Sequence, residues 1–534
     1  MAKRAQTIEI YAPTEGRKHD APTTMLDSRA MPDSLNSIMM YGSNQKDFGT
    51  SIYCTGTTPT VTSGASLIFD CKFPTSSVLQ IVTPTNVFKY TAGSDSFVSD
   101  GQTFTGGQNN VWNGYMYNDQ FYYTNYSDPI QNKSSVSATG TNWVSAISPT
   151  TYKAYCIGAL GEHLNLYHVS ENGTEYYKRV RWTTKGIMPA TTAFGTGLAG
   201  AIDLVDMEGE LKTAVPLGIT NAIYGERSIH IQNWVGGSTV YQFVKNISGI
   251  GTPSRRGVLS IGDVNYVLGQ NNFYEYYGGT DLRPIGDPIA KYAFNFINRT
   301  SLNLAFVSYE PVDDEVYFHV PVNSDTHPTV AWVYKRDNKT WTYRERPYTA
   351  KGSTTRTNSI TIGDLVGSIG QQNYLIGDTL LREGSEIAIY TDPTGYVVKR
   401  DRTIFSVQVG TTSTPQIYKY VTPDLTGISP INKQYADPYD QDKMDYSNKN
   451  KRWIKYNTEL NGSGYVNLAY SIDFGLSYIP FAASPIQLTG GTVFLQLDID
   501  ESSKQIRYRT MTTGTNDTIA VTYAATEFIP GSVN

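Results

Sequence analysis

The sequence predicts an all-β protein: a β-propeller with an additional C-terminal β domain and an irregular N-terminal arm. Its 534 residues include 40 Tyr and 47 Gly, and only 17% of them are charged. Tyrosine and β-branched residues favour strands, whereas glycine and asparagine favour the tight turns that join strands. Strand pairs recur at separations of roughly 40–50 residues, which is the period of propeller blades.

Residues 1–50 are predicted to form the irregular arm. Pro13, Pro22 and Pro32 interrupt regular elements there, because proline lacks a backbone N–H and fixes φ. Only residues 34–40 could form a short helical or extended piece. An arm of this kind usually docks on another part of the molecule or on a neighbouring subunit.

Residues 51–410 are predicted to form the propeller. The strongest hairpin signal is Asn172-Gly173, because a two-residue Asn-Gly turn suits positive φ at both positions. Further strand pairs are expected at residues 304–322, 329–345, 359–377 and 386–401. In a closed ring the strand edges are short and protected, so an all-β chain of this size avoids edge-to-edge aggregation.

Residues 101–151 are expected to be a variable insertion in the propeller. They are rich in aromatic residues, among them Tyr115, Tyr117, Phe121, Tyr122, Tyr123 and Tyr126. Two interpretations are open. The favoured one is that these side chains form cross-strand pairs on pleated sheets. The other is that they form a surface on which sugars stack.

The stretch from residue 224 to residue 286 gives the clearest succession of strand, turn and strand. Residues 228–232 alternate polar and apolar side chains, as a strand with one buried face does. Residues 241–244, 258–261 and 264–268 are further β-rich runs, with no helical period between them. Gly262-Asp263 supplies one of the turns that join them.

Residues 411–534 are predicted to form a C-terminal β domain that closes or flanks the propeller. A polar linker containing Pro423, Pro430 and Pro438 precedes a set of strongly alternating strands. Within this set, one turn fits the Asp-box pattern Ser-x-Asp-x-Gly-x-Ser/Thr-aromatic, through Ser471, Asp473, Gly475, Ser477 and Tyr478.

The Asp-box pattern is familiar from sialidase-type propellers, and its physics is structural. We expect Asp473 to accept hydrogen bonds from backbone amides, Gly475 to adopt positive φ, and Tyr478 to pack beneath the turn. A glycosidase would also need paired carboxylates, or a Tyr nucleophile with an Arg cluster. The turn is therefore predicted to be structural and not catalytic.

A series of motifs, taken in order, resembles one protein family. The motifs are RVRWTTKG (residues 179–186), AIDLVDMEGEL (201–211), YGERSIHIQNW (224–234), GIGTPSRRGVLSIGDVNYVLG (249–269) and LRPIGDPIAKYAFNFIN (282–298). The ending is similar too, with YSIDFGLSY (470–478) followed by TIAVTYAATEF (518–528). This order resembles the tail nozzle, or packaged-DNA stabilisation, proteins of short-tailed bacteriophages. The resemblance covers residues 150–400 well and 450–530 fairly, and it is weak over the first 150.

The resemblance implies a structural virion protein of β-propeller fold that is made in the host cytoplasm and resides in the tail. It implies a homohexameric ring below the portal and its adaptor, which retains packaged DNA, forms the channel for genome ejection and holds tail fibres or spikes. Double-stranded DNA would pass through this channel without specific binding. The net charge of −5 agrees with such a wall, because DNA affinity depends mainly on Lys and Arg contacts to phosphates.

Two acidic clusters are candidates for the channel lining: Asp203, Asp206, Glu208 and Glu210, and Asp313, Asp314 and Glu315. The alternative is that both clusters are solvated loop tips. Arg255 and Arg256, which follow Pro253-Ser254, are expected either to contact a partner subunit or to cap a turn.

The sequence offers no support for catalysis, a cofactor or a metal ion. Gly195–Gly200 matches G-x-G-x-x-G, but in an all-β context without the βαβ unit of a dinucleotide site. His163 and His168 lack the Glu of a zincin, and the aspartates between residues 437 and 445 lack EF-hand spacing. The three cysteines, Cys54, Cys71 and Cys156, are expected to be small buried residues.

No secretory signal is expected, since no apolar core follows the basic N-terminal residues. A glycan-binding propeller that recognises a receptor stays open as the alternative function, and a sialidase-like glycosidase is a weaker one.

Overall fold

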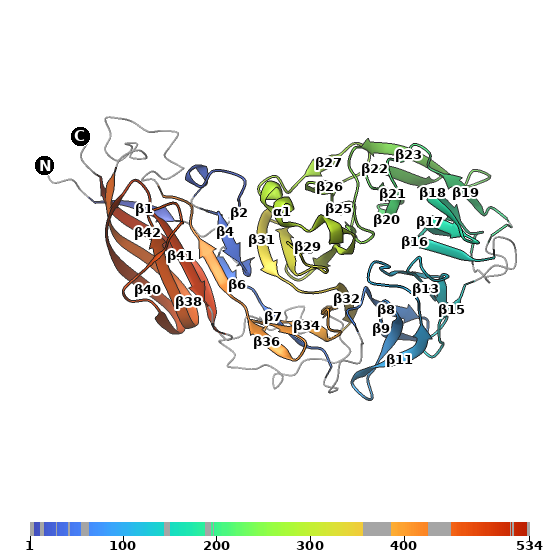
Figure 1. Ribbon diagram of the computed structural model, residues 1–534, viewed down its shortest axis with the longest axis horizontal. Helices are drawn as coiled ribbons and strands as arrows, with labels where there is room; N and C mark the ends of the chain where they lie inside the picture. Colours follow the sequence, from blue (N-terminus) through green and yellow to red (C-terminus); the bar gives the residue numbers. More distant parts are fainter. Residues whose placement is uncertain are drawn as a thin grey trace.

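The computed structural model describes residues 5–530, except for 11–14, 28, 41–42, 55–62, 144–149, 187–193, 196, 356–385, 426–449, 513 and 515–516. The all-β prediction is confirmed, and the propeller has seven four-stranded blades (Figure 1). The strand pair expected at residues 359–377 and most of the predicted linker lie outside the described residues.

Each blade is an antiparallel sheet, and in blades 1 to 6 the first strand along the chain lies at the centre of the ring. Blades 1 to 3 consist of β8 (Leu67–Phe73), β9 (Ser76–Val82), β10 (Asn86–Thr91) and β11 (Ser96–Thr103); β12 (Asn113–Tyr117), β13 (Gln120–Thr124), β14 (Gln131–Lys133) and β15 (Thr141–Asn142); and β16 (Tyr152–Leu160), β17 (His163–Glu171), β18 (Thr174–Trp182) and β19 (Gly200–Asp203). Blades 4 to 6 consist of β20 (Leu211–Leu217), β21 (Thr220–Gly225), β22 (Ser228–Trp234) and β23 (Tyr241–Ser248); β24 (Val258–Ile261), β25 (Val264–Leu268), β26 (Phe273–Tyr276) and β27 (Leu282–Pro284); and β28 (Phe306–Glu310), β29 (Glu315–Val320), β30 (Val330–Lys335) and β31 (Thr340–Glu345).

Blade 7 joins two distant parts of the chain. Its inner strands are β32 (Ala350–Thr355), β33 (Glu386–Thr391) and β34 (Val397–Asp401), and its outer strand is the N-terminal β7 (Gly49–Ile52). β7 pairs antiparallel with β34, with Thr50 opposite Arg400. The chain therefore closes its own ring by placing an early strand on the last blade.

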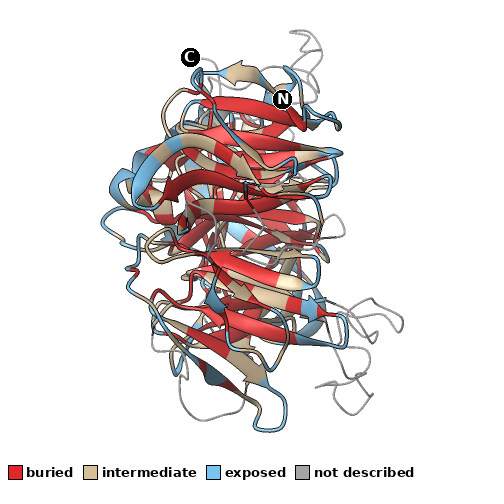
Figure 2. Cartoon of the chain, turned by 90° about the vertical axis from the view of Figure 1, so that its right-hand side faces the viewer, coloured by how far each residue is buried: buried red, intermediate tan, exposed pale blue. Residues whose placement is uncertain are grey.

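The core of the propeller lies between neighbouring blades. Val78 and Val82 of blade 1 pack with Phe121 and Tyr123 of blade 2. Figure 2 shows the consequence, with buried strands inside and exposed turns at their ends. Apolar residues that face a neighbouring sheet thus explain the alternation seen in the sequence.

Residues 113–142, expected to be an insertion, form blade 2 and are an integral part of the ring. Tyr115 lies opposite Tyr122 across β12 and β13, so the interpretation as cross-strand pairs is confirmed. Tyr122 and Tyr123 are buried. The other interpretation, a sugar-stacking surface, is wrong for these two rings because neighbouring blades cover them.

One α-helix, α1 (Ala290–Phe296), and a 3-10 helix, η2 (Arg299–Leu304), lie between blades 5 and 6. Ala293 and Phe294 of α1 are buried in the same core as Phe273 and Trp332. Among the residues that the structure describes, no helix is long and apolar enough to span a membrane.

A second β unit follows the propeller, after the small hairpin of β35 (Ser406–Val409) and β36 (Thr412–Pro415). Its strands are β37 (Tyr418–Val421), β38 (Lys451–Ser471), β39 (Ile479–Pro480), β40 (Ile486–Ser503), β41 (Arg507–Thr512) and β42 (Thr518–Pro530). They surround a core that includes Trp453, Tyr456 and Phe528. This unit lies beside the propeller in Figure 1.

The N-terminal residues, expected to be irregular, contribute several short strands to the two units. Four of these strands join the C-terminal sheet: β1 (Gln6–Ile10), β4 (Asp33–Leu35), β5 (Ser37–Met40) and β6 (Ser43–Lys46). The remaining pair, β2 (Gly16–Arg17) and β3 (Ala30–Met31), runs parallel. The 3-10 turn η1 (Thr23–Met25) lies between them in the chain. Since β7 follows directly in blade 7, this segment connects the two units.

Candidate functional site

The loop that precedes blade 5, residues 249–257, lies at the centre of the propeller, and we call it the hub loop. Its backbone bonds to blade 4, where the Thr252 amide donates to the Gly225 carbonyl at 3.0 Å. The Ser254 hydroxyl donates toward the Ala305 carbonyl at 2.6 Å, just before the first strand of blade 6. A Cβ on Gly251 would lie 2.1 Å from the Gly225 carbonyl oxygen, so only glycine fits here.

Arg256 connects the hub loop to three more segments of the ring. Its Nη1 donates to the carbonyls of Ser66 at 2.7 Å and Thr349 at 3.0 Å, which precede blades 1 and 7. Its Nη2 donates to the Leu304 carbonyl at 3.1 Å, before blade 6. Arg256 thus joins separate blades of the same chain, and the interpretation as a local turn cap is wrong for it; contact with a partner subunit stays a prediction.

Arg255 points to the other side of the ring. Its guanidinium lies 3.4 Å from the centroid of the Tyr155 ring in blade 3 and donates to the Asn125 carbonyl of blade 2 at 3.4 Å. Burial lowers the pKa of Arg255. Through its backbone and these two side chains, the hub loop contacts all seven blades. This end of the propeller axis is therefore occupied by protein.

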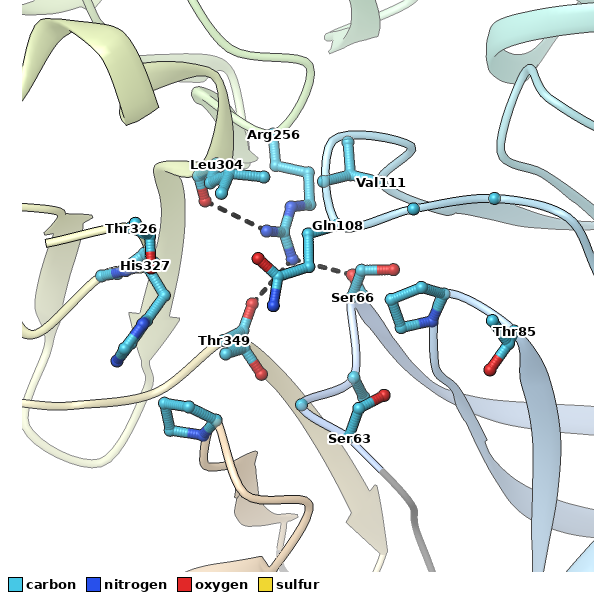
Figure 3. Close-up of a pocket in the computed structure, with 17 residues that line it drawn as sticks. Ser63, Ser66, Thr85, Gln108, Val111, Arg256, Leu304, Thr326, His327 and Thr349 are labelled. Carbon is cyan, nitrogen blue, oxygen red and sulfur yellow. Dashed lines mark hydrogen bonds between the residues drawn. The ribbon is translucent and has the colours of Figure 1, made fainter.

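A pocket of about 260 Å³ lies against Arg256 (Figure 3). We call it the Arg256 pocket. Its walls are mainly apolar or hydroxyl-bearing and come from loops at one end of the ring, and they comprise Ser63, Gly64, Ala65, Ser66, Pro84, Thr85, Gly106, Gly107, Gln108, Val111, Arg256, Leu304, Thr326, His327, Pro328, Thr349 and Pro393. This set contains no Asp or Glu. Burial without a neighbouring carboxylate lowers the pKa of Arg256 to about 10.

The Asp-box-like turn has the geometry of a structural turn. The Asp473 carboxylate accepts hydrogen bonds from the Ser477 amide at 3.0 Å and from the hydroxyls of Ser471 and Ser477. These bonds, led by the one from the Ser477 hydroxyl, lower the pKa of Asp473. Gly475 has a φ of +82°, and Arg509 stacks on the Tyr478 ring at 4.2 Å. The turn holds its own loop together.

The first acidic cluster lies at the end of β19 and in the connection from β19 to β20, and each of its members contacts a lysine, an arginine or a histidine. Asp203 lies 2.7 Å from Arg179, Asp206 3.1 Å from His230, Glu208 2.7 Å from Lys245, and Glu210 3.1 Å from Lys212. The carboxylates are partly exposed, and a lysine or arginine balances the charge of three of them. The fourth, Asp206, contacts His230, whose pKa burial lowers. Whether they face a channel in an assembly stays a prediction.

For two members of the second acidic cluster, the expectation of a surface position is wrong. Asp313 and Glu315 are buried, as is Asp47, and all three lie among arginines. Glu315 is 2.6 Å from Arg344, and Asp313 is 3.2 Å from Arg400. These are internal ion pairs of blades 6 and 7, so neither residue lines a channel or tips a solvated loop.

Asp314 is the one member of that cluster with a partly exposed side chain. Its carboxylate lies 2.9 Å from Arg336, which also donates to the Tyr266 hydroxyl at 2.9 Å. Asp314 therefore has a basic partner within the chain, Arg336, as the members of the first cluster have theirs.

Two histidines singled out in the sequence, and the three cysteines, have structural positions. His163 and His168 are buried, and each bonds to a backbone carbonyl, of Thr183 and Leu211 respectively. Cys71 and Cys156 are buried and Cys54 is half-buried, all with free thiols. Within the described residues no group of three or more His, Cys, Asp or Glu side chains could hold a metal ion. The aspartates between residues 437 and 445 lie outside them.

No family model and no curated protein matches this sequence. Solved structures of low identity do match. The extracellular domain of a putative hybrid two component system from B. thetaiotaomicron is 10% identical, with a TM-score of 0.36. The match covers 66% of this chain and 39% of that one, so this chain spans well under half of its length. The Pan2 WD40 domain of Neurospora crassa is 8% identical with a TM-score of 0.36, covering 70% of this chain and 99% of its own.

An exo-beta-1,3-galactanase from Phanerochaete chrysosporium, solved with galactose, is 9% identical with a TM-score of 0.26, covering 80% of this chain and 97% of its own. The similar structures thus include an enzyme as well as a WD40 domain. At these scores the fold of this chain rests on its own strand pairing, and its function rests on its own residues.

Proposed function

We propose that this chain is a structural virion protein that assembles into the ring-shaped tail nozzle of a short-tailed bacteriophage. In this role the ring lies below the portal and adaptor, retains packaged DNA and forms the channel for genome ejection. The proposed partners are five further copies of the chain, the adaptor, and tail fibres or spikes. The protein acts without catalysis.

The order of the sequence motifs carries this proposal. The five motifs between residues 179 and 298 fall on consecutive blades: β18 and β19 of blade 3, β21 and β22 of blade 4, the hub loop with β24 and β25, and then β27 with α1. They include the residues that join the blades. A resemblance that follows the construction of the ring through three blades is more specific than any one of its motifs.

The hub loop adds a constraint on the proposed channel. Because this loop fills one end of the propeller axis, DNA cannot pass through the ring of blades within one subunit. The channel must then be enclosed between subunits, as a ring of copies requires. Closed cyclic assemblies of identical subunits are common among homo-oligomers.

The balance of charge also supports a passive wall. The chain carries a net charge of −5, and two of the acids in the first cluster, Asp203 and Glu208, are paired with Arg179 and Lys245. A surface of this kind lacks the excess of Lys and Arg that holds phosphates. DNA could slide along it without being retained by many contacts.

The Arg256 pocket supports the non-catalytic part of the proposal. Most glycoside hydrolases use a pair of carboxylates beside the scissile bond. No Asp or Glu is present among the described residues that line this pocket. The Asp-box-like turn lies in the C-terminal unit, and its single aspartate is engaged by its own loop.

Electron microscopy of the purified protein tests the proposal, alone and mixed with the portal and adaptor proteins of the same phage. We expect closed rings with an open lumen that admits duplex DNA and that stack coaxially on the adaptor. Monomers or trimers that ignore the adaptor at micromolar concentration would contradict the proposal.

A glycan-binding propeller is the second candidate, favoured by the pocket at one end of the ring. It predicts carbohydrate binding by an isolated subunit and no dependence on the adaptor. A glycan array probed with monomeric protein separates it from the nozzle, and release of sugar from a bound glycan would favour a glycosidase.

A further inference from the structure

The Arg256 pocket contains a positive charge that the described chain leaves uncompensated. Three of the five N–H groups of the guanidinium donate to the carbonyls of Ser66, Thr349 and Leu304. Carbonyl groups accept hydrogen bonds but carry no net charge to balance the cation. No ion pair joins Arg256 to a carboxylate within the described residues, and its Nε is buried without a partner.

A buried cation without a counter-ion is costly, because desolvation is not repaid by an opposite charge. The same desolvation lowers the pKa of Arg256. An anion that entered the pocket would lower this cost by pairing with the guanidinium. A carboxylate suits this role, since a charge-assisted hydrogen bond from arginine is stronger than a neutral one, and one N–H of Nη2 has no partner among the described residues.

The rest of the pocket indicates the body of such a ligand. Pro84, Pro328 and Val111 give apolar contact, and Ser63, Thr85 and Thr326 bring hydroxyl groups to the same space. Figure 3 shows the amide of Gln108 near Arg256 and the ring of His327 across the pocket. A surface that alternates apolar patches and small polar groups suits a ring with several hydroxyls.

The volume limits the size of the ligand. At about 260 Å³ the pocket is smaller than the roughly 300–1,000 Å³ of sites that hold drug-sized molecules. A single sugar ring suits this space. The walls come from loops of blades 1, 2, 6 and 7, and Arg256 of the hub loop bonds to three of the lining residues, Ser66, Leu304 and Thr349.

We propose that the Arg256 pocket binds one acidic monosaccharide unit, with the carboxylate of the sugar directed at Arg256. Its hydroxyls are received by Gln108, His327 and the hydroxyl-bearing loops. The site lies within one chain and does not require assembly into a ring. The proposal therefore does not depend on the role as a tail nozzle.

Isothermal titration calorimetry with sodium glucuronate, against glucose at equal ionic strength and pH 7, tests the proposal. We expect the full-length protein to bind glucuronate at least tenfold more tightly than glucose. Equal binding of the two sugars would overturn the role of the charge, and no binding of glucuronate would leave Arg256 a structural cation only.

Two variants locate the site. Gln108→Trp places a bulky ring on an exposed loop residue and should weaken glucuronate binding at least tenfold, whereas Thr174→Trp, on a distant hairpin tip, should not change it. Arg256→Gln should also remove the preference over glucose, with near-ultraviolet circular dichroism as the check that the variant folds. If Arg256→Gln does not fold, Gln108→Trp and His327→Ala still decide, and wild-type binding by both would overturn the location.

Discussion

Gly475 adopts a backbone conformation that other residues resist, and this makes it a sensitive point of the C-terminal unit. Its φ of +82° lies in the left-handed region, where a β-branched residue is strained. A Cβ there would also lie 2.5 Å from a terminal nitrogen of Arg507, the end of a flexible side chain. Backbone strain is therefore the main cost of a substitution.

We expect Gly475→Val to destabilise the protein by about 1–3 kcal/mol, measured by urea unfolding followed through tryptophan fluorescence. Gly93→Val is the matched control, since Gly93 has no heavy atom near its Cβ position and no positive φ. An unchanged midpoint for Gly475→Val, or an equal loss for both variants, would contradict this account of the turn.

His168 is a second sensitive position, because it is buried in its neutral form. Its ring stacks on Tyr155 at 3.6 Å, and Glu210, Lys212 and Arg255 are the charged groups near it. Burial lowers the pKa of His168 to about 4. An unfolded histidine titrates near 6.5, so between these values the unfolded state binds the extra proton. The contribution of neutral His168 to the free energy of unfolding is therefore fully present above pH 6.5, and it is lost as the pH drops toward 4.

His168→Asn should reduce this acid sensitivity. Asparagine tolerates the φ of 54° found at this position. We expect the variant to lose up to about 3 kcal/mol less than the wild type between pH 7 and pH 4, measured by urea unfolding at both values. Equal losses would show that other groups cause the acid sensitivity, such as the buried His319, whose pKa is also lowered.

Among the elements, the N-terminal segment is tied to the propeller by a buried cluster of charges. Asp47, between β6 and β7, pairs with Arg346 and lies 2.9 Å from Arg400 and 3.4 Å from Arg344. Burial opposes the charge of Asp47, but these arginines outweigh it and hold the pKa of the carboxyl well below its usual range. The carboxylate thus neutralises cations from blades 6 and 7 at once.

Asp47→Asn should destabilise the protein by about 3–5 kcal/mol, because it leaves buried arginines with too little negative charge. Asp500→Asn is the control, since the pair of Asp500 and Arg452 is exposed and contributes little. Thermal unfolding at pH 7 measures both variants. A loss as small as that of the control would mean that Glu315 and Asp313 suffice to balance the cluster.

Elements that are fixed by contacts between residues close in the sequence could be predicted from it. Elements that depend on contacts between distant residues could not. Local alternation indicated the strand from Ser228, and an Asn-Gly pair indicated the turn between β17 and β18. The seven-residue α1 is too short to show a helical period, and it forms because Ala293 and Phe294 pack in the core between blades 5 and 6. Its sequence, AKYAFNF, contains more aromatic residues and asparagine than strong helix formers, and no side chain caps its N-terminus.

The candidate site was less accessible from the sequence than the fold. Arg256 appeared as part of a Pro-Ser turn, whereas its partners lie 48 to 190 residues away. Glu315 looked like a loop acid until Arg344, on another strand of the same blade, was placed beside it. Such contacts can be inferred only once the arrangement of the blades is known, since no local sequence pattern indicates which distant residues meet.

At the scale of the whole molecule, blade 7 depends on a close contact made by β7. Gly49 begins this strand, and a Cβ there would lie 2.0 Å from the Ser406 carbonyl oxygen. The three atoms nearest to this Cβ position all belong to the Ser406 backbone, which leaves little room for adjustment. The closure of the ring is thus sensitive to a single methyl group.

We expect Gly49→Ala to destabilise the protein by about 1–3 kcal/mol through overpacking and to loosen blade 7 first. Hydrogen exchange should show faster exchange at the amides of β33 and β34 than in the wild type, with β17 and β22 unchanged. Gly107→Ala, in an open loop, is the control. Uniform acceleration across all blades would contradict a local effect at the closure.

Because β7 pairs with the last blade, the ring can close only late in the synthesis of the chain. Asp47 emerges from the ribosome early, yet its partner Arg400 is made 353 residues later. At roughly 5–20 residues per second, this interval lasts roughly 20–70 s. During that time the first strand of the closure has no blade to join, and its edge is open to other nascent chains. Slow translation or crowded polysomes should therefore favour wrongly paired copies, and the yield of folded protein should depend on how well chaperones protect this early strand.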